Sequence, residues 1–460
     1  MVVAQLVDRA RAAMETFDNT DQAAIDDAVT ALAWSIYKPE NARRLAELAV
    51  ESTGLGNVED KVIKNQRKTF GTLRDLLRVK STGVIEELPE KGLVKYGKPI
   101  GVVAAITPST NPAATPVNKA MMAVKGGNAV IIAPSPAGYA ATAATVDGMR
   151  AELAKVAAPS DLVQIVPAPV DRERTLALMA AADLIVCTGS QNNVRKAYSS
   201  GTPAIGVGAG NVPVIIDESA DLTAAAEKIT ASKIFDNATS CSSENSVIIV
   251  DEIFDDAIAA LTEAGGYMTT PDEGRRVVER LWVDGKLNRK VIAKDAETLA
   301  EVFDLPAAAK SARFMMVEET GIGPAHPLSG EKLSLVLTVY RGNDFAHAQQ
   351  LALEILEFQG KGHSLGLHTN LLERARKLAE DMPVVRVLVN QAHTFANGGG
   401  FDTGLPFTLS MGCGSWGGNS ITENLNYRHF INITHLVTSV AEDKPTEAEL
   451  FGQYWEKYGQ

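Results

Sequence analysis

The stretch "GVVAAITPSTNPAATPVNKAMMAVKGGNAVIIAPS" (101–135) contains a strand, a polar turn, a helix and a second strand in succession. Its ends are short runs of small and β-branched apolar residues, which favour strands. Between them, apolar residues recur at the three- and four-residue spacing that is typical of a helix. Continuously apolar strands that alternate with helices predict a parallel sheet covered on both faces.

The same alternation continues along most of the chain. Further apolar runs follow in "LVQIVPAP", "DLIVCTGS" and "VPVIIDES", separated by segments of helical periodicity. A second series begins at "SVIIVDE" and continues through "RFMMVEET", "LSLVLTVYRG", "HSLGLHT" and "VVRVLVN". Residues 1 to about 80 have helical spacing throughout. The predicted fold class is therefore α/β, with two α/β domains built on parallel sheets.

Two remaining segments have the imperfect alternation of β extensions. They are "GVIEELPEKGLVKYGKPI" (83–100) and "RHFINITHLVT" (428–438). Neither carries enough apolar surface to fold alone. We therefore predict that they form an oligomerisation arm, in a homodimer or homotetramer.

Composition limits the functional classes. Hydrophobic residues make up 45% and charged residues 22% of the 460 residues, as in ordinary soluble globular proteins. The net charge of −12 argues against nucleic-acid binding and requires local donors for any anionic substrate. No apolar run suggests a membrane span, and the N-terminus lacks the features of a signal peptide. Three cysteines cannot all pair, which favours free thiols and a cytoplasmic location, and no metal site is predicted.

The three cysteines differ in their surroundings. Cys187 lies in the apolar run "DLIVCTGS", where a buried small side chain is the simpler interpretation. Cys413 lies in the glycine-rich "SMGCGSWGGNS" and could be structural or reactive. Cys241, in "IFDNATSCSSENSVIIVDE" (234–252), lies in a polar loop at the seam between the two α/β series. From these residues alone, Cys241 is either a catalytic nucleophile or an inert loop thiol.

Two glycine- or turn-rich segments are ambiguous on their own. "GVGAGN" (206–211) precedes a strand and so fails as a dinucleotide fingerprint, which should open a helix. Asn111 and Pro112 stand at a predicted helix start, where backbone N–H groups could meet a phosphate. An ordinary strand–helix–strand crossover is the alternative interpretation of that segment.

Taken together, the segments resemble the aldehyde dehydrogenase superfamily, and specifically its coenzyme-A-acylating branch. The resemblance is carried, in order, by "ITPSTNP", "DLIVCTGS", "AYSSGTPAIGVGAGNVPVIID", "IFDNATSCSSENSVIIVD", "GEKLSLVLTVYR" and "LSMGCGSWGGNSITENLNYRHFINI". It covers roughly residues 95 to 440. It implies a nicotinamide-cofactor-binding domain (1–82 and 99–233), a catalytic domain (234–427), and an arm with a C-terminal tail (83–98 and 428–460).

The resemblance also implies a mechanism. Cys241 matches the nucleophile that forms a thioester with the oxidised aldehyde. Asn111 matches the asparagine that stabilises the oxyanion, and coenzyme A is the implied acyl acceptor. Hydrolysing relatives carry a water-activating glutamate, whose position falls here at Gly206. His363, in "KGHSLGLHT", matches a histidine of the acylating branch that could move a proton or be purely structural.

The implied cofactor is NADP or NAD, with a slight preference for NADP. In the matching "APSP" segment, the lysine and glutamate that hold the adenine ribose in hydrolysing relatives are absent. Without an acidic residue there, a 2′-phosphate is not repelled. The implied cofactor-binding residues are Pro134, Ser135, Thr188, Gly189, Ser190, Gly206 and Glu331.

The aldehyde is expected to be small. The segment "NQAHTFANGGGFDTGLPFTLSMGCGSWGGNS" (390–420) most resembles enzymes acting on sulfoacetaldehyde, while acetaldehyde and succinate semialdehyde are alternatives. Two rival functions come from other classes: a cysteine hydrolase with no redox role, and a non-catalytic structural protein on a dehydrogenase fold.

Overall fold

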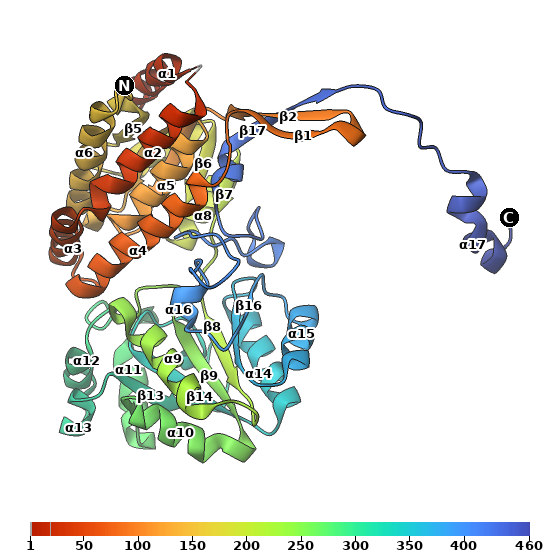
Figure 1. The fold of residues 1–460 in the computed structure, drawn as a ribbon. Helices are drawn as coiled ribbons and strands as arrows, with labels where there is room; N and C mark the ends of the chain where they lie inside the picture. Colours follow the sequence, from red (N-terminus) through yellow and green to blue (C-terminus); the bar gives the residue numbers. More distant parts are fainter. Residues whose placement is uncertain (1, 19) are drawn as a thin grey trace.

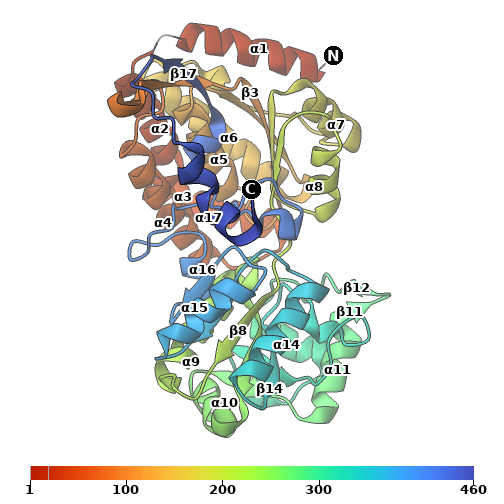
Figure 2. The same ribbon diagram turned by 90° about the vertical axis from the view of Figure 1, so that its right-hand side faces the viewer.

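The computed structural model describes residues 2–18 and 20–460. Two α/β parts lie one above the other, and a β arm leaves the upper part (Figures 1 and 2). The N-terminal helices cover the upper part, as the helical spacing of the first 80 residues predicted. They are α1 (Val2–Phe17), α2 (Gln22–Tyr37), α3 (Pro39–Thr53) and α4 (Val58–Leu77).

The upper part is built on a parallel five-stranded sheet of order β5-β4-β3-β6-β7. From β3 the chain first adds β4 and β5 on one side of the sheet and then crosses over to add β6 and β7 on the other side. The connections after β3 and before β6 therefore lead away in opposite directions. Such a point leaves a crevice at the carboxyl ends of the strands, where ligands bind. The strands are β3 (Val102–Thr107), β4 (Ala129–Pro134), β5 (Val163–Ile165), β6 (Leu184–Cys187) and β7 (Ala204–Gly206).

Helices pack around this sheet and complete its core. Residues of β3 and β4 such as Val103 and Ile131 are fully buried, as expected for strands covered on both faces. The helices of this part that follow β3 are α5 (Ala114–Lys125), α6 (Tyr139–Lys155), α7 (Arg172–Ala181) and α8 (Gln191–Tyr198). No helix in the described part of the chain has both the length and the apolar character needed to cross a membrane.

The lower part is built on a parallel seven-stranded sheet of order β10-β13-β14-β9-β8-β15-β16. Its strands are β8 (Val212–Ile216), β9 (Glu244–Val250), β10 (Gly266–Met268), β13 (Phe314–Glu318), β14 (Val336–Gly342), β15 (Leu365–His368) and β16 (Val387–Val389). The main helices beside it are α9 (Leu222–Ile234), α10 (Phe254–Glu263), α11 (Pro271–Leu281), α12 (Ala296–Phe303), α14 (Phe345–Phe358) and α15 (Leu372–Asp381).

One expected boundary needs correction. We placed residues 99–233 in the cofactor-binding domain, but β8 pairs with β9 and β15 in the lower sheet. The boundary at residue 233 therefore lies after a strand that belongs to the second sheet. The apolar run "VPVIID" predicts a buried strand, but such a run can pair with any parallel neighbour. The sequence therefore does not indicate which of the two sheets this strand joins.

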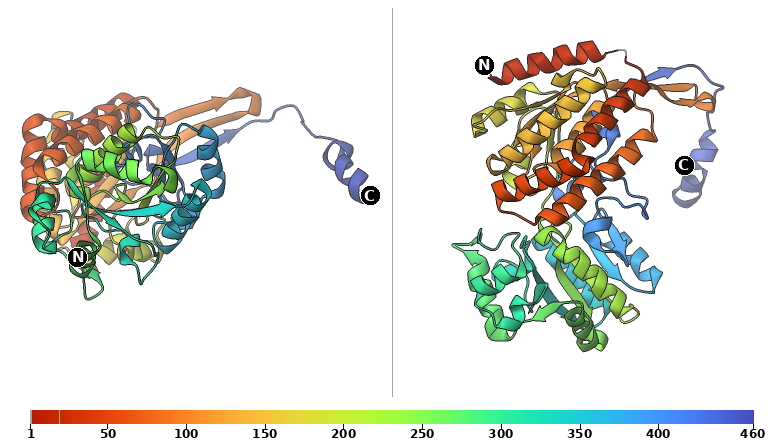
Figure 3. Two further views of the ribbon diagram at one scale, coloured as in Figure 1. Left: turned by 90° about the horizontal axis from the view of Figure 1, so that it is seen from below. Right: turned by 60° about the vertical axis from the view of Figure 1, so that its left-hand side comes forward.

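The predicted β extensions form one antiparallel sheet. It consists of β1 (Gly83–Leu88), β2 (Leu93–Pro99) and β17 (Ile431–Val437), in the order β1-β2-β17. After β17 the chain continues to the helix α17 (Glu447–Tyr458), which stands away from the two α/β parts in Figures 1 and 3. The tail we expected after the arm therefore ends in a helix.

Candidate active site

A cleft of about 680 Å³ lies between the two sheets. One wall comes from the carboxyl ends of β3, β4 and β6, and the other from the loops that precede β8, β9 and β14. The seam on which the sequence placed Cys241 is therefore a real cleft. Eight of the residues singled out from the sequence line it: Asn111, Pro134, Ser135, Thr188, Gly189, Ser190, Cys241 and Glu331.

An unusual backbone turn leads into the loop of Cys241. Asp236, Asn237 and Ala238 all have positive φ, at 52°, 51° and 59°. The left-handed conformation costs an L-residue roughly 1–2 kcal/mol. Three such residues in a row need strong tertiary support. The turn ends directly before Thr239 and Ser240, which line the cleft beside Cys241.

That support comes from the buried carboxylate of Asp236. Lys61 and Lys64 on α4 donate to Asp236 Oδ2 at 3.0 and 2.5 Å, and Thr239 donates to the same atom at 2.7 Å. The backbone N–H of Asn57 donates to Asp236 Oδ1 at 3.0 Å. Burial alone would raise the pKa of Asp236, but the two lysines hold it below its usual value. The carboxylate therefore stays ionised and fixes the turn before the nucleophile.

The same lysine orients the predicted oxyanion donor. Lys64 Nζ donates to Asn111 Oδ1 at 2.8 Å. An ammonium can only donate, so it selects the amide oxygen of Asn111 and leaves the Nδ2 protons for another acceptor. Asn111 lines the cleft together with Cys241. Its amide is thus prepared to donate to an oxygen bound there.

The segment before β8 approaches the nucleophile closely. A Cβ at Gly210 would overlap the carbonyl oxygen of Cys241, so only glycine fits at that position. Residues Val207, Gly208, Ala209 and Gly210 all line the cleft, and none has a carboxylate. The segment 207–210 therefore offers no side chain that could activate water.

Gly206 itself does not line the cleft, contrary to the expectation from the resemblance. Its N–H donates to the hydroxyl of Tyr198 at 2.9 Å, and a Cβ there would press against Val194 and Tyr198. Gly206 is the last residue of β7 and faces α8. The first residue of the segment that reaches the cleft is Val207. Sequence matching across a glycine-rich segment cannot fix the register to one residue.

The thiol of Cys241 is half-buried and rests protonated. Burial raises its pKa to about 12, with further contributions from the Glu331 carboxylate and the Cys413 thiol. The Ser242 hydroxyl and the Arg386 guanidinium act in the opposite direction.

Sequence reasoning missed Arg386, a buried cation near both thiols. Its guanidinium donates to the Asn397 side chain at 2.7 Å, to the Asn424 side chain at 3.1 Å and to the Gly412 carbonyl at 2.7 Å. All three partners are neutral, so the positive charge remains available to its surroundings. It lowers the pKa of both Cys241 and Cys413. No sequence pattern marks a lone arginine in "VVRVLVN" as special.

His363 is not brought to the cleft. The ring is buried, its Nδ1 lies 2.7 Å from the Ser364 hydroxyl, and its Nε2 has no hydrogen-bond partner in the described chain. Burial and the nearby Arg386 charge lower its pKa to about 3. The ring is therefore neutral near pH 7, and the geometry gives it no contact with Cys241. Cys187 and Cys413 are buried too, as small interior side chains.

The cofactor side of the cleft fits a dinucleotide. Ser190 caps the N-terminus of α8, and Gly189 has a φ of 153° with open space where a side chain would stand. The Thr188 hydroxyl is 2.8 Å from that of Ser410, which fixes the end of β6. A backbone exposed in this way beside a helix start suits a pyrophosphate. The residues that would hold the group at this end are Thr188, Gly189 and Ser190.

Glu331 and Arg172 extend this surface. The backbone N–H of Glu331 donates to the Gln359 side chain at 3.0 Å, and burial raises the pKa of its carboxyl to about 8. The oxygens of this carboxyl group can accept from ribose hydroxyls. Arg172, at the start of α7, lines the same cleft as Ser135, with its side chain exposed. Nothing in the local sequence distinguished Arg172 from other surface arginines.

Within residues 2–18 and 20–460, no group of three or more histidine, cysteine, aspartate or glutamate side chains is arranged to hold a metal ion.

A comparison with protein-family models identifies the chain. The model described as "Aldehyde dehydrogenase family" matches residues 2–275. The chain belongs to the aldehyde dehydrogenase family. The predicted oxidoreductase class, the α/β fold with its small β arm, and the resemblance to this family are thereby confirmed.

Relatives of this aldehyde dehydrogenase cover almost its whole length. "Sulfoacetaldehyde dehydrogenase (acylating)" from Cupriavidus necator is 51% identical over 99% of this chain and 93% of its own. A protein of the same description from Bilophila wadsworthia is 43% identical over 99% of each chain. The crystal structure of an acetylating aldehyde dehydrogenase from Geobacillus thermoglucosidasius superposes with a TM-score of 0.92, at 34% identity, over 96% of this chain and 98% of that one.

Proposed function

We propose that this aldehyde dehydrogenase oxidises sulfoacetaldehyde and transfers the acyl group to coenzyme A, through a thioester on Cys241. The observation that carries the proposal is the shared cleft of Cys241 and Asn111, whose wall at Val207–Gly210 has no carboxylate. The names of the two relatives at 51% and 43% identity support both the substrate and the acylating reaction.

In the first step, Cys241 releases its thiol proton to solvent and the resulting thiolate attacks the aldehyde carbon, so that a carbon–sulfur bond forms and the carbonyl π bond breaks. The carbonyl oxygen becomes an oxyanion, which accepts from Asn111 Nδ2 and from the backbone N–H of Cys241. Lys64 keeps the amide of Asn111 in the orientation that donates. When bound, the nicotinamide accepts the hydride that leaves the substrate carbon. Cys241 then carries a thioester.

In the second step, the thiolate of coenzyme A attacks the thioester carbon and Cys241 leaves as its thiolate. A thiol is a good nucleophile once ionised and needs no carboxylate to activate it. Water is a poor nucleophile at neutral pH without a general base. The absence of an acid among Val207, Gly208, Ala209 and Gly210 therefore favours thiolysis over hydrolysis.

For the cofactor we propose NADP in preference to NAD. Pro134, Ser135 and Pro136 contribute no carboxylate to the cleft, and the exposed Arg172 lines it as well. The neighbouring carboxylate of Asp171 is engaged in capping α7, where it accepts from the backbone N–H of Arg174. A guanidinium is well suited to a 2′-phosphate because it offers several donors in a planar fork. Thr188, Gly189, Ser190 and Glu331 would hold the rest of the cofactor.

We further propose that the arm joins subunits of a homodimer or homotetramer. Ile433, Leu436 and Val437 on β17 are exposed apolar residues at the edge of a three-stranded sheet. An apolar edge strand of this kind is stabilised by pairing.

The three thiols are free, which fits the reducing cytoplasm, where we place the enzyme. With β8 reassigned, we propose a cofactor-binding domain of residues 1–82 and 99–211 and a catalytic domain of residues 212–427.

The substrate is tested with an aldehyde panel. The purified enzyme is assayed with sulfoacetaldehyde, succinate semialdehyde and acetaldehyde, each with NADP or NAD and with or without coenzyme A. We expect the highest kcat/KM with sulfoacetaldehyde and coenzyme A, and an acyl-CoA product by mass spectrometry. Ester cleavage with no change in nicotinamide absorbance for any aldehyde would instead indicate a cysteine hydrolase.

A further inference from the structure

One side of helix α4 presents cations to the interior of the protein. Lys61, Lys64 and Lys68 are buried and follow one another at three- and four-residue spacing, and Arg67 is half-buried beside them. Lysine and arginine are seldom buried unless they are paired. This concentration of positive charge is notable in a chain with a net charge of −12.

Two of these cations have an internal partner. Lys61 and Lys64 share the carboxylate of Asp236, and Lys64 also orients Asn111. These two lysines therefore hold the loop of Cys241 and the side chain of Asn111 in place.

The other two cations lack such a partner. Lys68 Nζ donates to the carbonyl of Gly398 at 2.8 Å, and Arg67 Nη1 is a buried atom with no hydrogen-bond partner among residues 2–18 and 20–460. In the described chain neither side chain has a carboxylate within ion-pair distance, and Asp402 acts on Arg67 only from farther away. A buried charged donor left unsatisfied is costly. Arg67 and Lys68 are therefore prepared for an anion that the chain itself does not supply.

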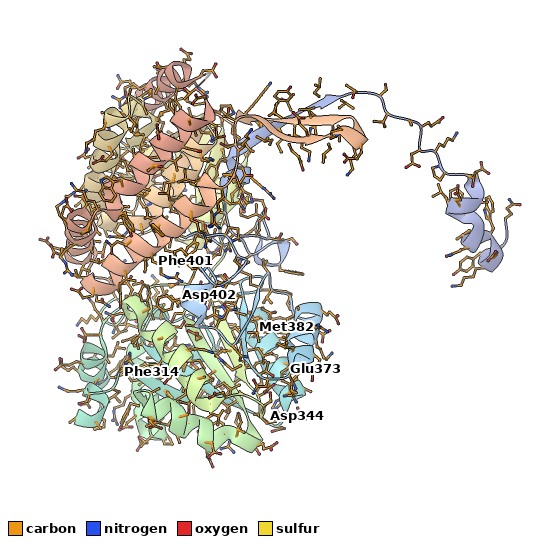
Figure 4. The ribbon with its side chains drawn as sticks, in the orientation of Figure 1. Phe314, Asp344, Glu373, Met382, Phe401 and Asp402 are labelled. Carbon is orange, nitrogen blue, oxygen red and sulfur yellow. The ribbon has the colours of Figure 1, made fainter. Side chains whose placement is uncertain are left out.

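Aromatic rings hold these two side chains in place. The Arg67 guanidinium lies 5.6 Å from the ring centroids of Phe395 and Phe401 and 5.4 Å from that of Phe407. Lys68 Nζ lies 5.5 Å from the Phe407 centroid. Such contacts offset part of the cost of burying a cation but do not neutralise it. The rings come from a single segment, 395–407, and Figure 4 labels two of its residues, Phe401 and Asp402, between the upper and lower parts.

Neither side chain lines the cleft itself, but Lys68 lies one helical turn after Lys64, whose Nζ contacts Asn111 in the cleft. Gly398, whose carbonyl accepts from Lys68, packs against Met411, because a Cβ on Gly398 would lie 3.6 Å from the Met411 sulfur. Burial and the neighbouring cations Arg67 and Lys64 lower the pKa of Lys68 to about 7, and an anion bound beside it would raise that pKa again. The ring segment continues directly into Leu409 and Met411, which line the cleft. Phe401 is half-exposed and Arg67 is only partly buried, so an anion can reach the guanidinium from solvent.

We propose that Arg67 and Lys68 bind the sulfonate group of the aldehyde substrate and hold its carbonyl carbon at Cys241. This inference rests on the proposed function. A sulfonate is a permanent anion with three acceptor oxygens, and it can accept from a guanidinium and an ammonium at once. An uncharged aldehyde leaves both cations without a counter-ion and Arg67 Nη1 without an acceptor, which discriminates against it.

The test compares two variants with a matched control. Arg67→Met and Lys68→Met each remove one cation, while Arg74→Met removes a guanidinium that contacts Phe401 and Phe407 but is already paired with Asp75. For each protein, kcat and KM are measured with sulfoacetaldehyde, succinate semialdehyde and acetaldehyde. We expect each of the first two substitutions to lower kcat/KM for sulfoacetaldehyde about ten- to hundredfold, mainly through KM. Acetaldehyde turnover should stay within about twofold in all three variants, and Arg67→Lys should recover part of the loss.

Equal losses with sulfoacetaldehyde and acetaldehyde would overturn the inference, because they indicate a structural role. Unchanged preference for sulfoacetaldehyde in soluble Arg67→Met would overturn it as well, and this variant remains informative if Lys68→Met fails to fold. The unaltered enzyme could instead prefer succinate semialdehyde and lose this preference in the same variants. That result would show that the two cations bind a carboxylate, and it would contradict the sulfonate assignment. If the unaltered enzyme does not prefer sulfoacetaldehyde to acetaldehyde, the proposed function fails first, independently of the variants.

Discussion

Lys64 Nζ lies 2.8 Å from Asn111 Oδ1 and 2.5 Å from Asp236 Oδ2, so one ammonium orients the oxyanion donor and anchors the turn before the nucleophile. The donor and the nucleophile belong to different sheets. Lys64, on a helix that precedes both in the chain, connects them. Their relative position is thus set by a residue that has no part in the chemistry itself.

This relationship predicts coupled effects of two substitutions. Asn111→Ala should lower kcat by about 10²–10³, the usual loss for one oxyanion donor. Lys64→Met should lower kcat as well, because the amide of Asn111 is then free to turn. Since both act on one hydrogen bond, the double variant should lose much less than the product of the two single losses. Strict multiplication of the losses in steady-state assays would show that Lys64 acts independently of Asn111.

Asp236→Asn should destabilise the folded enzyme. It leaves two buried lysines without their carboxylate, and removal of one member of a buried ion pair costs about 3–5 kcal/mol. The pKa of Asp236 is below its ordinary value of 3.8 in the folded state, so its contribution is full above about pH 4 and is lost as the pH falls further. In urea at pH 7 the variant should therefore have a lower free energy of unfolding than the unaltered enzyme. This difference in free energy should become smaller in acid. A pH-independent difference would contradict this role of the charge.

The ionisation of Glu331 should control the reactivity of Cys241. The Glu331 carboxylate raises the pKa of the thiol, and its own pKa is about 8. Below pH 8 the carboxyl is mostly neutral, so Glu331→Gln should be alkylated by iodoacetamide at the unaltered rate. Above pH 8 the variant should react faster, because its thiol is no longer opposed by a negative charge. Labelling is assigned to Cys241 by peptide mass spectrometry, and a variant that reacts more slowly at pH 9 would refute the coupling.

Arg172→Ala should distinguish the two cofactors. If the guanidinium meets the 2′-phosphate, its removal should raise the Kd of NADP by roughly tenfold or more and leave the Kd of NAD unchanged. Arg195→Ala, an exposed arginine on α8 outside the cleft lining, is the matched control. Fluorescence titration measures both constants without turnover. An equal rise in the Kd values of NADP and NAD would show that Arg172 does not contact the 2′-phosphate specifically.

The sequence predicted the elements whose signal is local. The long apolar runs became β3, β4, β6, β9 and β14, and the periodic N-terminus became four helices. The short strands β7 and β10 were missed because their sequences, "AIG" and "GYM", contain glycine and no run of β-branched residues, unlike the equally short β5 and β16. The sheet of β8 was also missed, since strand pairing is a tertiary choice.

The site was predictable to the same extent. Cys241, Asn111 and Glu331 stand in motifs and line the cleft. Arg386, Arg67 and Lys68 stand out only because they are wholly or partly buried and have no carboxylate within ion-pair distance in the described residues, and both properties arise only on folding. His363 resembled a catalytic residue by motif alone, and the fold buries its ring away from the cleft lining.

A rapid-mixing experiment on the acyl transfer step examines the thioester on Cys241 itself. Enzyme, cofactor and aldehyde are mixed without coenzyme A, and the nicotinamide absorbance is followed. Because no carboxylate at Val207–Gly210 activates water, we predict a burst of about one reduced cofactor per active site and then slow turnover. Addition of coenzyme A should restore steady turnover to acyl-CoA, and Cys241→Ala should show no burst. Rapid steady turnover to the free acid without coenzyme A would contradict the mechanism, because another residue would then have to activate water.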